Sequence, residues 1–277
     1  MPLPDRAAQC KRLTHEDSRE APGKHITPMG LTLHHRCYAP DTLTAQAANA
    51  IVQRWYETAE RFAAEQRIEQ VLPISHEPAD LERWATMWKI QPHPADAESS
   101  MGIQVRPLAG WVFPVEIGSD CELLWIGLCR YPATVTHSGR KVPTALGNGW
   151  RFQRSCKTQY ASLHGWEHFR RCHVAALDLL QTGRHLGVRV HIEDEGGYWP
   201  GCDEAKLHSE LTRMNRVVAA MAGALKDEAE SSSQQSGAVD SPIFRHPQFE
   251  RLEAEGKHEH REAVDAAIRA WREDQSA

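Results

Sequence analysis

The stretch Leu123-Leu-Trp-Ile-Gly-Leu-Cys129 is apolar on both of the faces that an extended chain presents. A run of this length fits a strand better than a helix, and two apolar faces are typical of a strand buried inside a sheet. This stretch therefore predicts a central strand, and its neighbours in the sequence should supply the rest of the sheet.

Other short apolar or alternating runs lie around it, separated by Gly, Pro, Ser and Asp, at 103–106, 111–117, 150–160 and 188–194. In the run at 188–194, the apolar Val188, Val190 and Ile192 alternate with polar residues. Successive side chains of a strand point to opposite faces, so this alternation predicts a sheet with one polar face, open to solvent or to a ligand.

Helical periodicity flanks these runs. Apolar residues fall on one helical face around 48–63, and further helices are predicted to begin near Pro78, Trp166 and Asp203. Strands clustered between helices, without strict alternation, favour an α+β fold. We expect a two-layer sandwich with a mixed, mostly antiparallel sheet and with helices packed chiefly on one face.

Composition divides the chain into segments. Residues 1–33 lack apolar periodicity and read as a disordered leader, and residues 34–229 are predicted to form a single α+β domain. Residues 230–246 are rich in Ser and Gln and predict a flexible linker. Within 247–277, apolar residues spaced at i, i+3, i+4 and i+7 from Val264 to Trp271 predict one amphipathic helix.

The totals exclude several classes of protein. A net charge of −5 and a pI near 6.3 do not indicate a nucleic-acid or membrane partner. Seven scattered cysteines without a Cys-x-x-Cys pair argue against a zinc ribbon and against a disulfide framework. The sequence contains neither a secretory h-region nor a run of apolar residues long enough to span a bilayer, so a cytoplasmic location is expected.

The leading candidate site is Glu193-Asp-Glu195, which precedes the turn Gly196-Gly-Tyr-Trp-Pro200. Crowded carboxylates raise one another's pKa values, which suits general acid–base chemistry, and carboxylate oxygens also bind hard metals. Asp194 and Glu195 are thus predicted ligands of a possible divalent metal ion. The alternative is an acidic loop in which the aspartate caps the turn and the two aromatic residues fold back onto the core.

Two further residues are predicted to share the polar sheet face with these carboxylates. If the strands at 150–160 and 188–194 are neighbours, Lys157 and His191 point to that face. The resulting hypothesis is an enzyme whose catalytic site contains Lys157, His191, Glu193, Asp194 and Glu195.

A second candidate is His164-Gly-Trp-Glu-His168, which matches the His-x-x-Glu-His pattern of inverted zincins, with Cys172 one turn further on. A helix that begins near Trp166 would place His164 at or before the N-cap, where the spacing of two helical zinc ligands is not assured. We therefore expect the purified protein to contain almost no zinc. The alternative is that His164 caps the helix.

The segments at 156–162, 169–173 and 190–199 resemble an uncharacterised family of bacterial hypothetical proteins, with the likeness running over roughly 110–228. That family has no assigned activity, so the resemblance implies no catalytic residues. Two functions stay open. The first is an enzyme with an acidic site, with or without a divalent metal ion, and the second is a non-catalytic adaptor that recognises a protein partner through tryptophan-rich surfaces and the C-terminal helix.

Overall fold

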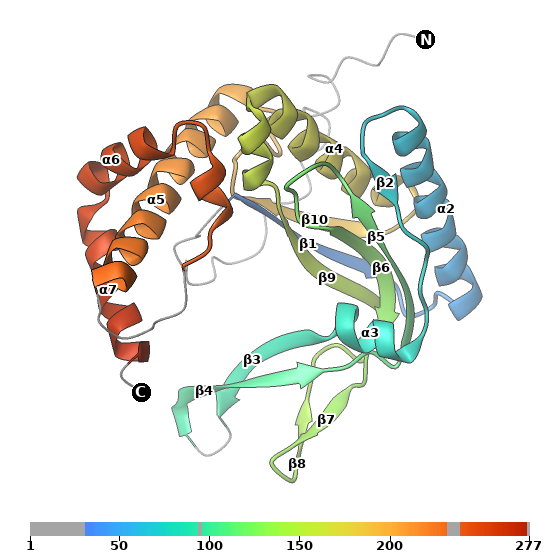
Figure 1. Ribbon diagram of the computed structural model, residues 1–277. Coiled ribbons are helices and arrows are strands. Elements are labelled where there is room, and N and C mark those ends of the chain that lie inside the picture. Colours follow the sequence, from blue (N-terminus) through green and yellow to red (C-terminus); the bar gives the residue numbers. More distant parts are fainter. Residues whose placement is uncertain (1–30, 94–95, 232–238, 276–277) are drawn as a thin grey trace. The chain divides into compact units, whose positions relative to one another are not determined.

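The computed structural model describes residues 31–93, 96–231 and 239–275 (Figure 1). The chain forms two compact units, whereas the sequence predicted a single domain over 34–229. The first, here called the sheet unit, comprises Leu33–Cys156 and Arg171–Glu193. The second, the helical unit, combines Lys157–Arg170 and Asp194–Ala277 with the N-terminal residues up to Thr32.

A six-stranded sheet forms the core of the sheet unit. In spatial order the strands are β10 (Arg189–Asp194), β1 (Thr32–Ala39), β9 (Trp150–Lys157), β6 (Leu124–Arg130), β5 (Ala109–Glu116) and β2 (Gln70–Val71). The pairs β2–β5, β5–β6 and β6–β9 are antiparallel. The α+β class and the mostly antiparallel sheet predicted from the sequence are confirmed.

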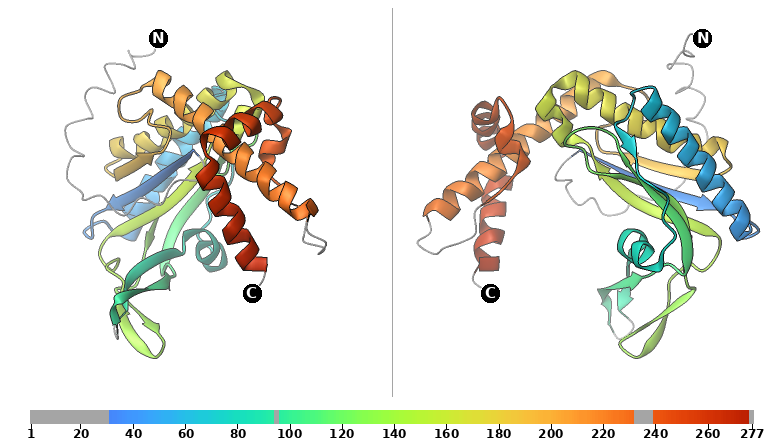
Figure 2. Two further views of the ribbon diagram at one scale, coloured as in Figure 1. Left: turned by 90° about the vertical axis from the view of Figure 1, so that its left-hand side faces the viewer. Right: turned by 45° about the vertical axis from the view of Figure 1, so that its right-hand side comes forward.

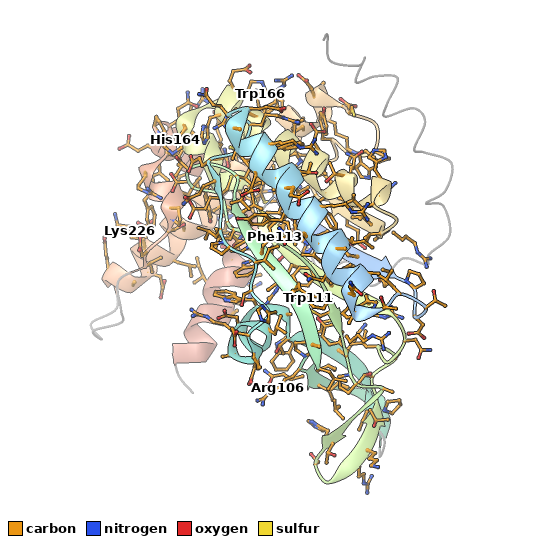
Figure 3. All side chains as sticks on the ribbon, turned by 90° about the vertical axis from the view of Figure 1, so that its right-hand side faces the viewer. Arg106, Trp111, Phe113, His164, Trp166 and Lys226 are labelled. Carbon is orange, nitrogen blue, oxygen red and sulfur yellow. The ribbon has the colours of Figure 1, made fainter. Side chains whose placement is uncertain are left out.

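The predicted central strand is β6, which lies between β5 and β9. Its Leu124, Ile126 and Leu128 on one face are fully buried, and Gly127 and Cys129 on the other face are buried too, as a strand covered on both sides requires. Helix α2 (Ala45–Ala64) packs on the side to which these residues point, since the Tyr56 ring meets the Phe113 ring edge-on with centroids 5.4 Å apart. Figure 3 labels Phe113 on β5 next to this helix.

Helix α4 (Trp166–His185) lies with α2 over the same face of the sheet (Figures 1 and 2). The indole Nε1 of Trp55 on α2 donates a hydrogen bond to the carbonyl oxygen of Leu179, at 2.8 Å. Gly183 lets the two helices approach, because a Cβ atom at that position would lie only 2.3 Å from Cη2 of Trp55. Helices therefore cover chiefly one face, as expected.

The opposite face is covered in part by the short helix α3 (Pro78–Ala85), whose Trp84 stacks on Trp125 of β6 at 4.4 Å between ring centroids. Two antiparallel hairpins extend from one end of the sheet (Figures 1 and 2). They are formed by β3 (Met87–His93) with β4 (Asp96–Val105), and by β7 (Thr134–His137) with β8 (Arg140–Pro143).

Helices make up most of the helical unit. Its elements are η1 (Gln159–His164), the first residues of α4, α5 (Glu204–Ser231), η2 (Pro242–Arg245), α6 (Phe249–Glu259) and α7 (Arg261–Gln275). Its C-terminal part contains two helices that pack on α5, where the sequence predicted one helix after a flexible linker. The segment predicted as one helix over 247–277 is thus divided at His260. Leu252 of α6 and Val264 of α7 are buried against alanines of α5.

The predicted boundaries differ from the structure at both ends. Leu31 and Leu33 are fully buried and β1 begins at Thr32, so the end of the predicted leader belongs to the fold. The rest of that leader, and residues 232–238 of the predicted linker, lie outside the described residues. In the part of the chain that the structure describes, no helix combines the length and the apolarity needed to cross a bilayer.

Candidate functional site

Hydrogen bonds within the helical unit engage the carboxylates of the acidic loop. The two oxygens of Asp194 accept from the backbone N–H groups of Gly196 and Trp199, each at 2.8 Å. Oε2 of Glu195 accepts from the backbone N–H of Thr32 at 2.9 Å. Tyr198 and Trp199 are both buried. The loop therefore has the hydrogen bonds of the capped turn that the sequence left open as the alternative, and its catalytic or metal-binding role stays a prediction.

The other three predicted site residues divide between the two units. In the sheet unit, Oε1 of Glu193 accepts a hydrogen bond from Arg36 at 2.9 Å and lies 3.3 Å from Nε2 of His191, so these residues do meet on the polar face. Lys157 belongs to the helical unit, where its Nζ lies 5.8 Å from the centroid of the Tyr160 ring.

The structure places His164 outside helix α4, as the sequence predicted. It is the last residue of η1, and Gly165 follows with a φ of +93° before the helix begins at Trp166. The rings of His164 and His168 lie 4.9 Å apart. The thiol of Cys172, within the sheet unit, is hydrogen-bonded with that of Cys121.

The described residues contain no group of three or more His, Cys, Asp or Glu side chains that could hold a metal ion. Five cysteines in this part of the chain are free thiols, whereas Cys202 is disulfide-bonded.

The arrangement that the sequence did not reveal is a set of cations around Tyr38. The guanidinium carbon of Arg151 lies 5.2 Å from the centroid of the Tyr38 ring, and that of Arg189 lies 5.7 Å from it. Three adjacent strands supply these side chains, since β1 lies between β10 and β9. Arg36, two residues before Tyr38, points to the same side of β1.

Alternation of burial shows which face of the sheet these side chains occupy. In β1 the half-buried Arg36 and Tyr38 alternate with the fully buried His35 and Cys37. In β10 the exposed Arg189 likewise alternates with buried residues. The cations therefore lie on the polar face that the sequence predicted, opposite to the face covered by α2 and α4.

Lys89 of β3 completes the set. Partial burial lowers the pKa of Lys89, and repulsion from Arg151 and from Arg36 lowers it further. We call Arg36, Tyr38, Lys89, Arg151 and Arg189 the basic cluster. Its members come from four strands that are widely separated in the sequence.

Carboxylates are scarce around the basic cluster. Glu193 pairs with Arg36, while Arg151, Arg189 and Lys89 have no carboxylate partner within the described ranges. The sequence around Arg151 carries a local signal of this imbalance, because residues 123–166 contain no Asp or Glu and six Lys or Arg. Arg36, Lys89 and Arg189 lie outside this segment. The net charge of the whole chain conceals that signal.

No family model, no curated protein and no solved structure matches the chain.

Proposed function

We propose that the polar face of the sheet binds an anionic ligand, and that the protein acts as a ligand-binding protein through the basic cluster. One observation carries the proposal: Arg151 and Arg189, on the two strands that flank β1, lie 5.2 and 5.7 Å from the centroid of the Tyr38 ring. Arg36 shares that side of β1 and pairs with Glu193, and Lys89 adds a further positive charge. Guanidinium groups suit this role because their planar arrays of donors match phosphate and carboxylate oxygens.

Stability alone does not explain the cluster. Arg151 and Arg36 repel Lys89, and Lys89 is also partly removed from water, so the ligand-free arrangement costs free energy. A purely structural surface would intersperse acids among these residues. An anion bound at this face would offset the repulsion, which is why a binding site accounts for the arrangement better than packing does.

The two functions expected from the sequence have less support. The enzyme hypothesis, with a possible divalent metal at Asp194 and Glu195, needs carboxylate oxygens that already accept backbone N–H bonds. The adaptor hypothesis needs a free apolar face on the C-terminal helix, but Leu252 and Val264 are buried on α5.

Titration calorimetry with inorganic tripolyphosphate tests the proposal. The double variant R151Q/R189Q should bind tripolyphosphate at least about tenfold more weakly than the wild type. Each guanidinium group that it removes would otherwise contribute a charged hydrogen bond to a phosphate oxygen, and such bonds are among the strongest in proteins. The control R54Q/R61Q makes the same charge change on the exposed surface of α2 and should bind within about twofold of the wild type. Equal affinities for both double variants would refute the proposal.

Thermal unfolding adds a second readout of the same proposal. Without ligand, R151Q/R189Q should melt at the same temperature as the wild type or higher, because it relieves repulsion. With tripolyphosphate, the wild type should gain melting temperature by mass action and the double variant should gain little.

A further inference from the structure

The hairpin β7–β8 extends the basic surface beyond the sheet. Its Arg140 and Lys141 are exposed, and they lie opposite His137 and Thr136 on the partner strand. Residues 123–166, which include the whole hairpin, contain no acidic residue. The ribbon therefore carries its positive charge next to its turn, at Arg140 and Lys141.

The hairpin and the basic cluster lie at the same end of the sheet. Arg151, near the start of β9, pairs with Cys129 at the end of β6, and β7 begins at Thr134, soon after β6 ends. Figures 1 and 2 show the hairpin projecting from this end. No long connection separates the two groups of cations.

The dimensions of this surface fit a chain better than a small ion. Crossing from β10 to β9 covers two strand spacings, about 10 Å, and a hairpin of four residues per strand adds about 13 Å. A single phosphate or carboxylate would engage one end only. A linear polyanion of several charges can contact the basic cluster and the hairpin together.

An aromatic ring on the same face indicates what that polyanion carries. Tyr38 is half-buried among the arginines, whereas Trp125 on the same face is already stacked on Trp84. Unpaired nucleic-acid bases stack on such rings while the backbone follows the cations, and sheet faces are used in this way.

From this geometry we infer that the ligand is a single-stranded nucleic acid, with phosphates running from the basic cluster along β7–β8 and with a base against Tyr38. This inference rests on the proposed function. The net charge of −5 does not oppose it, because at physiological salt a phosphate responds to charges within about 8 Å rather than to the whole chain.

Fluorescence anisotropy with labelled oligouridine and oligothymidine of about 15 nucleotides tests the inference. The variant R140Q/K141Q should weaken binding of both strands, and it should flatten the plot of log K against log salt by about 1.4, or about 0.7 for each lost phosphate contact. Y38L should weaken binding about tenfold through lost stacking. R54Q/R61Q serves as the control of equal charge.

Tripolyphosphate separates failure of this inference from failure of the proposed function. R140Q/K141Q should bind tripolyphosphate within about twofold of the wild type, because the arginines and Lys89 of the basic cluster still hold it. Tripolyphosphate binding without oligonucleotide binding would overturn the inference and leave the proposed function standing. If the wild type bound neither tripolyphosphate nor the oligonucleotides, both the inference and the proposed function would be refuted.

A duplex of the same length serves as the competitor. Duplex binding as tight as single-strand binding would overturn the role of unpaired bases, since paired bases cannot reach Tyr38. Binding of either single strand supports the inference, and the tighter of the two identifies RNA or DNA as the source.

Discussion

Replacement of His35 by Gln should change how the stability of the sheet unit depends on pH. His35 lies in β1, is fully buried, and has Nε2 2.9 Å from the carbonyl oxygen of Trp125. A carbonyl only accepts, so Nε2 carries the proton. Nδ1 is buried with no hydrogen-bond partner among the described residues. Burial lowers the pKa of His35 to about 4. The hydrogen bond to Trp125 opposes this shift, and the charges of the nearby His34 and Arg154 add to it.

The sign follows from the lowered pKa. The unfolded chain binds a proton at His35 below about pH 6.5, whereas the folded chain does not until about pH 4, so stability is lost as the pH falls through this window. Integration over the window gives about 2 kcal/mol lost between about pH 7 and pH 5, and about 3 kcal/mol by pH 4.

Urea unfolding of the wild type and of H35Q, followed by tryptophan fluorescence across this range, measures the effect. The other titrating groups contribute almost equally to both proteins and cancel in the difference. Glutamine can still donate a hydrogen bond to the Trp125 carbonyl oxygen and does not titrate. Any packing cost of H35Q therefore changes the difference in free energy of unfolding by the same amount at every pH, and the pH dependence of that difference comes from His35. A difference in free energy of unfolding that stays constant from pH 7 to pH 4 would refute the reasoning.

Three further substitutions test the packing of the two units. G183A should lower the free energy of unfolding by about 1–3 kcal/mol, because its Cβ would lie 2.3 Å from Trp55, while G201A, which meets no neighbouring atom, should leave the melt unchanged. D194N should destabilise by about 1–2 kcal/mol through weakened acceptance of two backbone N–H groups, measured by urea unfolding. A melting temperature raised by Mg²⁺ in the wild type and not in D194N would instead favour the metal site. L252A should cost about 2–4 kcal/mol in thermal unfolding, and a negligible loss would contradict the packing of α6 on α5.

Periodicity was sufficient for the elements with unambiguous patterns. The apolar run at 123–129 predicted β6, the residues around 48–63 predicted α2, and the start of α4 near Trp166 was placed correctly. Strand β1 was not predicted as a strand, because its buried positions include His35, and a buried histidine interrupts the apolar alternation that marks a strand. The break at His260 was likewise hidden, because its neighbours continue a helical pattern.

The basic cluster could not have been predicted in the same way. Its residues lie at 36, 38, 89, 151 and 189, and only the strand order β10-β1-β9 and the position of β3 bring them together. Alternation along one strand predicts which residues share a face, but not which strand lies beside it. The sequence therefore predicted a polar face and left its charge open.

The distribution of acids explains how a chain of negative net charge can present a positive face. Every Asp and Glu of the chain lies outside residues 123–166, the segment that forms β6, the hairpin β7–β8 and β9. The acids nearest in sequence to β10 have local partners: Glu193 binds Arg36, and Asp194 and Glu195 accept backbone N–H groups. These contacts engage the carboxylates locally. In the loop that first suggested a catalytic site, Asp194 and Glu195 thus accept hydrogen bonds from backbone N–H groups. The positive charges without a carboxylate partner, within the described ranges, lie on the sheet.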